Sequence, residues 1–280
     1  MTMASEALFS RKYKLTVGPA SGTGKEWDGL RIMFKVHKTA SSTPNKLEVD
    51  IYNLSASSRH FIEGKGKDWA VVLEAGYVAG IKTIFSGRLE LASSNKRGRH
   101  NHHHQGPDWV TKVKGFDGIR ENLVVLSKSF GPKTSESAVI NEIAREMGST
   151  VGTIKGLDKH KNYAHGRQIS GSASAELDSI CRTHNCRWSI QDGVLHILPY
   201  GEALDSTAFL LTPSTGLVGS PELTERGVKV TSLLLGGINP GKLVQLKTAD
   251  VNGLYIVETL VHRGDTHYQD WYTEMECFAV

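Results

Sequence analysis

Apolar and polar residues alternate along the first part of the chain. In Lys12–Gly18, Leu30–His37 and Leu47–Leu54 every other residue is apolar, as in a strand with one buried and one solvated face. Further strands are predicted at Trp69–Tyr77, Thr83–Leu91 and Asp108–Phe116, with a short helix from Ser57 to about Glu63. At least six strands in this part of the chain are enough for one β-barrel.

The stretch from Phe209 to Leu246 predicts the opening of a second barrel. Its short β-rich runs are interrupted by Pro213, Gly216, Gly219, Pro221, Gly236, Gly237 and Pro240, and no window of helix length survives between these residues. Asn239-Pro240-Gly241 has the composition of a tight turn. The strand after it places Val244 and Leu246 on one face and Leu243, Gln245 and Lys247 on the other.

An internal repeat links these two parts of the chain. The pattern Asp-Trp-x-Thr-x-x-x-x-Phe occurs at Asp108–Phe116 and again at Asp270–Phe278. Upstream, Ala70–Ala75 aligns with Leu243–Thr248, and the strand carrying Phe85 aligns with the strand carrying Tyr255. Phe85 precedes Trp109 by 24 positions and Tyr255 precedes Trp271 by 16. We therefore expect two related barrels, the first with a hairpin about eight residues longer within Arg97–Pro107.

The two longer predicted helices lie between the two predicted barrels. Apolar residues at Val139, Ile140, Ile143, Ala144 and Met147 form the stripe of an amphipathic helix, with Thr134 or Ser135 as N-cap and Gly148 at its end. A second helix is predicted from about Ala175 to His184 with Ser174 as its cap. Two alternating strands then flank Asp192-Gly193, a strong hairpin signal.

These patterns predict a mainly β chain with an α+β insert, in which two related tube-like β-barrels flank a small α+β domain. The expected boundaries are residues 1–117 for the first barrel, 118–204 for the central domain and 205–280 for the second barrel.

The same segments carry a resemblance to a known family. They are Ile51–Ser55, Glu74–Tyr77, Ile84–Gly87, Asp117-Gly118, Gln191–Leu195, Leu211–Pro213, Thr215–Pro221 and Asn252–Tyr255. In order and spacing, from about Lys12 to Phe278, the chain resembles the baseplate hub (tail hub) proteins of contractile-tailed bacteriophages. That family is related to the late control D proteins and to the hub part of type VI secretion spikes.

The resemblance implies a structural role without catalysis. It implies a homotrimer whose six barrels form a pseudo-sixfold ring between the tail tube and the central spike. The implied partners are a second and third copy of the chain, the spike protein, and a tail tube or tube-initiator protein, with a tape measure protein and the baseplate wedge as further candidates. The implied location is the virion tail baseplate, after assembly in the host cytoplasm. No cofactor, membrane contact or specific nucleic-acid binding is implied.

Composition narrows the possible classes of function only slightly. The formal net charge of +4 and the 39% hydrophobic content are those of an ordinary soluble protein, and the small basic excess does not argue for nucleic acid or an anionic membrane. No export signal or membrane-spanning run is recognisable. The odd number of cysteines, Cys181, Cys186 and Cys277, favours reduced thiols in a cytoplasmic setting, although Cys181 and Cys186 could pair.

Four histidines suggest one alternative, a metal site. His100, His102, His103 and His104 lie in the expected excess of the first hairpin, and imidazole binds Zn, Ni or Cu. An exposed polar tip is the favoured interpretation, because a metal site also needs rigid supporting partners. Lys96, Arg97 and Arg99 beside it could contact nucleic acid, an acidic neighbour or only solvent.

A second alternative is a tail-associated protein that binds peptidoglycan or degrades the cell wall. The carboxylates Glu142, Glu146 and Asp178 fall on predicted exposed helix faces, and no Gly-x-Ser-x-Gly elbow occurs. Gly22–Lys25 matches only part of a phosphate loop and is interpreted as a hairpin tip. Gly264-Asp265-Thr266 is expected in the hairpin before the last strand, and His184 near Cys186 is expected to end a helix. Catalytic, cofactor-binding and metal-binding residues are therefore all predicted to be absent.

Overall fold

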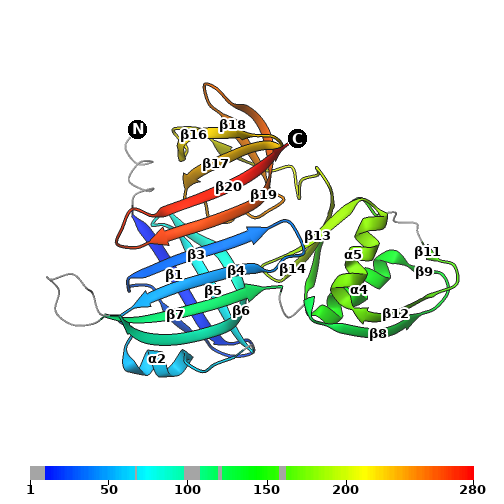
Figure 1. Ribbon diagram of the computed structural model, residues 1–280, viewed down its shortest axis with the longest axis horizontal. Helices are drawn as coiled ribbons and strands as arrows, with labels where there is room; N and C mark the ends of the chain where they lie inside the picture. The colour runs from blue at the N-terminus through cyan, green and yellow to red at the C-terminus, as the bar shows by residue number, and fades with distance from the viewer. Residues whose placement is uncertain (1–9, 67, 98–107, 119–121, 158–161) are drawn as a thin grey trace.

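Strands dominate the computed structural model (Figure 1). It describes residues 10–66, 68–97, 108–118, 122–157 and 162–280. These residues form one thirteen-stranded sheet and three small sheets of two or three strands. None of the helices in this part of the chain is long and apolar enough to cross a membrane. The fold is therefore mainly β, as the alternation in the sequence predicts.

The N-terminal part contributes seven strands to the large sheet, in the order β3-β4-β7-β6-β5-β1-β2. Their bounds are Arg11–Pro19 (β1), Lys25–Trp27 (β2), Ile32–Thr39 (β3), Asn45–Tyr52 (β4), Trp69–Tyr77 (β5), Gly80–Arg97 (β6) and Asp108–Asp117 (β7). In β4, Leu47, Val49 and Ile51 are fully buried and alternate with polar residues. Helix α2 (Ala56–Ile62) begins where the Ser55 hydroxyl accepts a hydrogen bond from the Ser58 N–H. The six predicted strands and the short helix are confirmed here.

The C-terminal part contributes the other six strands. Their bounds are Ala208–Leu211 (β15), Leu217–Thr224 (β16), Gly227–Leu233 (β17), Leu243–Lys247 (β18), Asn252–Asp265 (β19) and Trp271–Ala279 (β20). The order is β16-β17-β20-β19, and β18 pairs with the first residues of β19 and with β15. Val244 and Leu246 are fully buried, as the alternation in β18 predicts.

The predicted repeat is visible in the strand pairing. The first part contains the order β5-β6-β7-β4-β3, and the second contains β18-β19-β20-β17-β16 with the same connections. Each copy has a β-bulge at the same point of its long hairpin, where Glu90 or Glu258 is the extra residue. Because Ala70 pairs with Arg88, and Leu243 with Ile256, at matching distances before the bulges, the predicted alignment of Ala70 with Leu243 is confirmed.

One detail of the predicted alignment is wrong. Counted from the bulges, Tyr255 corresponds to Gly87 and not to Phe85. Thirteen positions separate Lys96 from its partner Trp109, whereas seven separate the matching Gly264 from Trp271. The first hairpin is therefore six residues longer, not eight, and the surplus lies between Lys96 and Trp109. The error arises because the aromatic character that Phe85 and Tyr255 share does not fix the register of their strands.

The two parts of the large sheet are continuous. Residues Thr259–Asp265 of β19 pair with Met33–Thr39 of β3 while also pairing with β20. Trp271 of β20 packs against Phe34 of β3, and its indole N–H donates to the Gly76 carbonyl. The path through the described strands ends at β16 and β2 and does not show two separately closed barrels. Closure into two barrels therefore stays a prediction.

The central part stands beside the large sheet (Figure 1) and has its own hydrophobic core. Its elements are Val125–Phe130 (β8), Thr134–Ser135 (β9), Glu136–Met147 (α4), Thr150–Ile154 (β10), Asn162–Tyr163 (β11), Arg167–Ser172 (β12), Ala173–Thr183 (α5), Cys186–Gln191 (β13) and Val194–Pro199 (β14). Helix α4 has the predicted buried stripe, Ser135 as N-cap and Gly148 at φ 73°. Two predicted strands around Asp192-Gly193 form the hairpin β13–β14.

Helix α5 begins two residues before the predicted start. Its N-cap is Ser172 instead of Ser174, and the Ser172 side chain makes no capping hydrogen bond. Strand β12 runs directly into the helix, and Ala173 is fully buried in the central core. Packing of Ala173, and not side-chain capping, therefore fixes where this helix begins.

Candidate functional site

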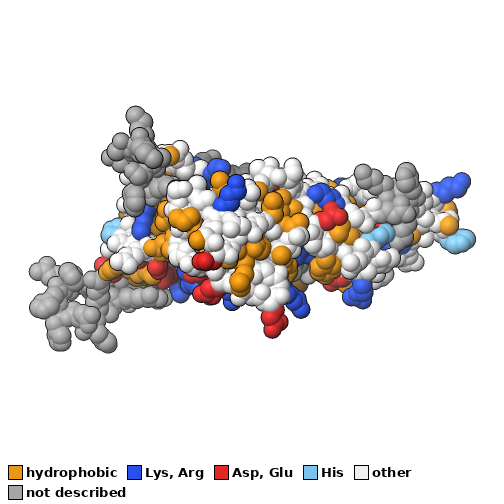
Figure 2. Space-filling model, turned by 90° about the horizontal axis from the view of Figure 1, so that it is seen from above, with side chains coloured by type: hydrophobic (Ala, Val, Ile, Leu, Met, Phe, Trp, Pro, Cys, Tyr) orange, Lys and Arg blue, Asp and Glu red, His pale blue; other side chains and the backbone are white. Residues whose placement is uncertain are grey.

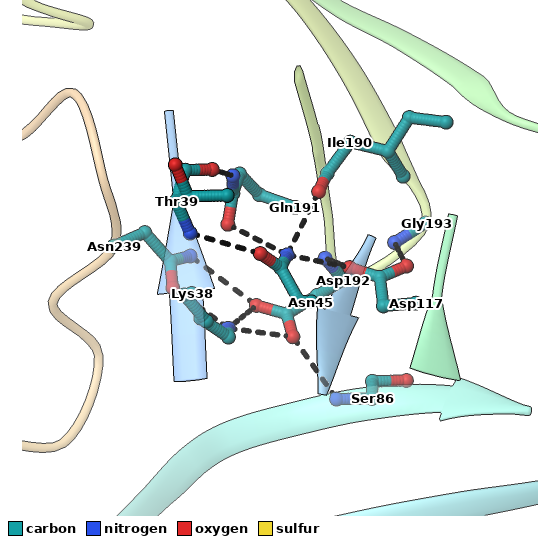
Figure 3. Close-up of polar contacts among 10 residues, drawn as sticks. All are labelled: Lys38, Thr39, Asn45, Ser86, Asp117, Ile190, Gln191, Asp192, Gly193 and Asn239. Carbon is teal, nitrogen blue, oxygen red and sulfur yellow. Dashed lines mark hydrogen bonds and ion pairs between the residues drawn. The ribbon is translucent and has the colours of Figure 1, made fainter. Parts of the chain in front are cut away.

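A cluster of buried and half-buried polar groups lies where the β13–β14 hairpin meets the large sheet (Figure 3). The sheet contributes Lys38 and Thr39 from the end of β3, Asn45 from the start of β4, Ser86 from β6 and Asp117 from the end of β7; the turn contributes Gln191, Asp192 and Gly193, and the loop before β18 contributes Asn239. We call these nine residues the junction. Asp192 and Gly193 have φ of 55° and 82°, the left-handed pair that a two-residue type I′ turn requires.

Lys38 is the centre of the junction. Its side chain is fully buried, and its Nζ lies 2.8 and 2.7 Å from the two carboxylate oxygens of Asp192 and 2.8 Å from Oδ1 of Asn239. All three ammonium N–H groups therefore have an acceptor. Asp192 also accepts from the Ser86 N–H at 3.0 Å and from the Asn239 amide at 3.2 Å. The ion pair between Lys38 and Asp192 thus also binds Ser86 of β6 and Asn239 of the loop before β18.

Asp117 receives the backbone of the same turn. Its Oδ2 accepts from the Asp192 N–H at 2.6 Å and its Oδ1 from the Gly193 N–H at 3.1 Å. Burial raises the pKa of Asp117 to about 7, and the neighbouring Asp192 carboxylate acts in the same direction. The carboxyl group therefore holds the β13–β14 turn through two hydrogen bonds, and its pKa lies near neutral pH.

Asn45 completes the contacts between the turn and the sheet. Its side-chain amide donates to the Ile190 carbonyl at 2.9 Å and to Gln191 Oε1 at 3.1 Å, and its Oδ1 accepts from the Thr39 N–H at 3.0 Å. Gln191 in turn donates to the Thr39 carbonyl at 2.7 Å. The central part is thereby bonded to both the backbone and the side chains of the sheet.

A buried histidine lies near the junction on β19. His262 is fully buried, and its Nδ1 lies 2.9 Å from the Thr273 hydroxyl. Burial lowers the pKa of His262 to about 3, and the Lys38 ammonium acts in the same direction. The imidazole is therefore neutral in the folded protein at physiological pH.

The charged groups of the junction bond mainly to other groups of the protein. None of three surface hollows formed by the described residues is lined by Lys38, Asp117 or Asp192. Removing one member would leave a buried polar group without its partner, which costs free energy. The arrangement therefore fixes the orientation of the central part relative to the sheet.

The sequence analysis did not identify the junction, although a signal was present. In β3 the alternate positions Ile32, Phe34, Val36 and Lys38 are buried, and in β4 the alternate positions Asn45, Leu47, Val49 and Ile51 are buried. Lys38 and Asn45 are thus polar residues in the apolar phase of a strand. Such residues are retained in a core only when partners satisfy them.

The predicted histidine cluster cannot be placed. His100, His102, His103 and His104 lie outside the described residues, as do the side chains of Arg97 and Arg99. Lys96 is described, and its ammonium lies 5.2 Å from the centre of the Trp109 ring. Among the described residues no group of three or more histidine, cysteine or acidic side chains is arranged to hold a metal ion.

The carboxylates considered for acid–base chemistry are engaged in ion pairs. Glu142 pairs with Lys128 and Arg145, and these cations lower its pKa to about 2, opposite to the shift that a general acid needs. Glu146 also pairs with Lys128, at 2.7 Å. Asp178 accepts from the Trp188 indole N–H at 2.7 Å. No catalytic carboxylate pair is formed by these three residues.

The structure also places the cysteines, His184 and the two glycine-containing segments that the sequence analysis considered. Cys181, Cys186 and Cys277 are buried free thiols, and burial raises the pKa of Cys181 and Cys277 to about 12. His184 ends helix α5 as predicted. Gly22–Lys25 leads from the β1–β2 turn into β2, and Gly264–Thr266 leads from β19 into the β19–β20 turn.

Open strand edges and exposed apolar residues occur at one end of the sheet. Strand β16 pairs only with β17, and β15 only with β18, so each has one free edge among the described strands. Leu210 of β15 and Leu254 of β19 both pair with Gln245 of β18, and the Val280 N–H donates to the Leu254 carbonyl. These three apolar residues are 43%, 41% and 74% exposed, in the order Leu210, Leu254, Val280. Figure 2 views this end and shows hydrophobic side chains gathered between scattered charges. Such edges and patches favour contact with another chain.

Comparison with protein families identifies this fold. A family profile described as Baseplate hub gp41 matches residues 15–277. The chain belongs to the baseplate hub gp41 family. This confirms the resemblance found in the sequence and makes the chain a member of a family of phage tail structural proteins. No curated protein matches the chain.

Solved structures of tail and secretion proteins share the fold of this baseplate hub family member. The 43 kDa tail protein of prophage MuSo2 from Shewanella oneidensis matches with a TM-score of 0.65 at 10% identity, covering 96% of this chain and 98% of that one. A tail protein from Neisseria meningitidis MC58 matches at 0.59 and 10%, covering 95% and 96%. The Escherichia coli c3393 protein, a component of the type VI secretion system, matches at 0.58 and 9%, covering 94% and 76%. At these identities the likeness concerns the fold alone.

Proposed function

We propose that this protein is the structural hub of a phage tail baseplate and forms a homotrimeric, pseudo-sixfold ring between the tail tube and the central spike. The observation that carries the proposal is the repeated unit: two segments of one chain share the strand order, the connections and the position of a glutamate bulge. Three chains with two such units each present six comparable units. A ring of this kind can face a sixfold tube on one side and a threefold spike on the other.

The domain organisation belongs to the same proposal. Residues 1–117 and 205–280 supply the two ring units, and residues 118–204 form the central α+β domain between them in the chain. The junction supports this assignment because it holds the β13–β14 turn on the sheet through Lys38, Asn45 and Asp117. A central domain fixed in this way keeps one orientation in every subunit.

The partners follow from the proposed role. The chain contacts two further copies of itself, the spike protein and a tube or tube-initiator protein, with the tape measure protein and the baseplate wedge as additional neighbours. It acts without catalysis in the virion tail after assembly in the host cytoplasm. The free edges of β15 and β16 and the apolar residues near them supply surfaces for contact between subunits.

Light scattering coupled to size exclusion tests the oligomeric state. We expect a mass of three times 30.6 kDa and, in negative-stain class averages, rings with six similar lobes. The free edge of β16 is tested with Leu223→Lys, because Leu223 is 74% exposed on that strand. The matched control is Leu123→Lys, which alters a residue that is 70% exposed in the central part.

The ring should be lost or weakened by the change at Leu223 and retained by the change at Leu123. A species that stays at 30.6 kDa at high protein concentration and after co-expression with its spike would contradict the proposal. Equal masses for both variants and the unaltered protein would exclude the β16 edge as the subunit contact.

A further inference from the structure

A polar hollow of about 410 Å³ lies on the central part, separate from the junction. It is bordered by the end of α5, the start of β13, the residue after β14 and the β3–β4 loop. Seven side chains with N–H or O–H donor groups line it: Ser41, Ser42, Arg182, Asn185, Arg187, Trp188 and Tyr200. Pockets of about 300–1,000 Å³ are the size that binds small ligands or single side chains with their flanks.

Arg187 is the unusual member of the lining. Its side chain is only 9% exposed, and its Nη1 pairs with Glu258. Its Nε is buried and has no hydrogen-bond partner among the described residues. A buried donor without a partner is unfavourable, so a ligand whose acceptor reached this group would remove that cost. The guanidinium thus already holds one carboxylate and has a donor left for a second.

Arg182 and Asn185 supply further donors on the same wall. Both are exposed, and the hydrogen bonds and ion pairs within the described residues do not include either side chain. Asp178, the one carboxylate among the lining residues, already accepts from the Trp188 indole. The free hydrogen-bonding capacity of the hollow is therefore mainly donor capacity.

Charge balance selects the class of anion. Arg182 and Arg187 are opposed by Asp178 in the lining and by Glu258 behind it. These two positive and two negative charges cancel, so the hollow has no net charge to attract a phosphate dianion or a nucleic-acid backbone. The free donors of the lining suit a single carboxylate instead, because the planar edge of an arginine can bind a carboxylate in a bidentate manner.

We propose that this hollow binds an acidic side chain of a different protein, with the carboxylate on Arg187 and Arg182 and the adjoining backbone along Tyr200. Tyr200 is 63% exposed, and its ring borders the hollow as an apolar wall, 5.9 Å from the Arg187 guanidinium. The volume exceeds what an isolated carboxylate fills and leaves room for the peptide groups beside it. This inference goes beyond the hub role and holds whether or not the chain forms a trimer.

The experiment follows the Arg187 Nε–Hε signal of the full-length protein by NMR. The signal is assigned by its loss in Arg187→Lys, which keeps a cation opposite Glu258 but lacks the Nε donor. The probe is the capped peptide acetyl-Gly-Glu-Gly-amide, and the neutral peptide acetyl-Gly-Gln-Gly-amide and sodium acetate serve as comparisons. Arg182→Gln tests the second cation, and Arg226→Gln, at an exposed arginine in the β16–β17 turn, is the control with the same change of net charge.

The glutamate peptide should shift the signal with saturation, whereas the glutamine peptide should not. Arg182→Gln should weaken binding about tenfold or more, as expected for loss of a charged hydrogen bond, and Arg226→Gln should leave it unchanged. No shift with the glutamate peptide, or equal shifts with both peptides, would overturn the proposal. Acetate binding as tightly as the glutamate peptide would exclude a polypeptide occupant. A shift caused by raising protein concentration alone would make the occupant a second copy of this chain, and would exclude a different protein.

Discussion

Replacing Lys38 with methionine tests the junction most directly. Methionine has a similar length and is apolar, so it can fill the space while removing the buried ammonium. The substitution leaves the Asp192 carboxylate without its cation and beside Asp117. It also removes the donor to Asn239 Oδ1.

The expected loss of stability can be bounded from the geometry. Breaking a fully buried ion pair by removing one partner costs about 3–5 kcal/mol. Because the Asp192 side chain is 21% exposed and water can solvate part of the orphaned carboxylate, we expect the lower end, about 3 kcal/mol. For a chain of this size that corresponds to a fall of roughly 6–12 °C in the melting temperature.

A double-mutant cycle separates the ion pair from packing. The free energy of unfolding is measured by urea denaturation at pH 7 for Lys38→Met, Asp192→Asn and the double variant, with far-UV circular dichroism as the signal. Asparagine tolerates the left-handed conformation that residue 192 adopts, at φ 55°. The double variant should be more stable than Lys38→Met alone, because it no longer contains an unpaired buried charge.

Two results would refute this account of the junction. One is a Lys38→Met protein within about 0.5 kcal/mol of the original, the range of ordinary surface substitutions. The other is a double variant whose loss equals the sum of the two single losses, since independent sites are additive and paired sites are not.

Further predictions concern pH and packing. Because the pKa of Asp117 is raised from 3.8 to about 7, this residue makes the free energy of unfolding fall as the pH rises from about 4 to about 7; Asp117→Asn should remove that slope. Because the pKa of His262 is lowered from 6.5 to about 3, it makes stability fall as the pH drops through that range; His262→Gln should remove the opposite slope. Both are read as differences from the unaltered protein in urea midpoints at several pH values, and a variant with an unaltered profile would contradict the assigned shift. In Gly227→Ala the new Cβ would lie 2.0 Å from the Cys277 carbonyl oxygen, so we expect a loss of about 1–3 kcal/mol by thermal melting. In the control Gly29→Ala the new Cβ has no atom within 4 Å, so its melting temperature should equal that of the unaltered protein. Equal melting temperatures for the two variants would show that β17 and β20 can move apart to accept the new Cβ.

Alternation in the sequence predicted most of the large sheet, because each strand buries one face. Alternation underestimated the length of β6, which was predicted to end at Leu91 but continues to Arg97. Ser93, Asn95 and Lys96 break the apolar pattern, and only pairing with β7 keeps them in the strand. The short strands β8 and β12 of the central part were not predicted, since Val125 and other residues in them are exposed. Local pattern does not reveal pairing that tertiary structure imposes.

The junction shows the same limit in another form. Lys38 and Asn45 could be flagged from the sequence as polar residues at buried strand positions, but their partners could not. Asp192 is 154 positions from Lys38, and Asn239 is 201 positions away. Contacts of this range follow from how the strands are ordered in space, which periodicity in a single sequence does not encode.

Strand β19 has a mechanical consequence for the whole molecule. Its first residues bond to β18 and its later residues to β3, so one uninterrupted segment of backbone spans both halves of the sheet. A force that pulled the halves apart along this strand would load the β3–β19 hydrogen bonds in shear, all at once, instead of opening them one after another. The two halves should therefore transmit an axial load as one stiff plate, without a hinge between them.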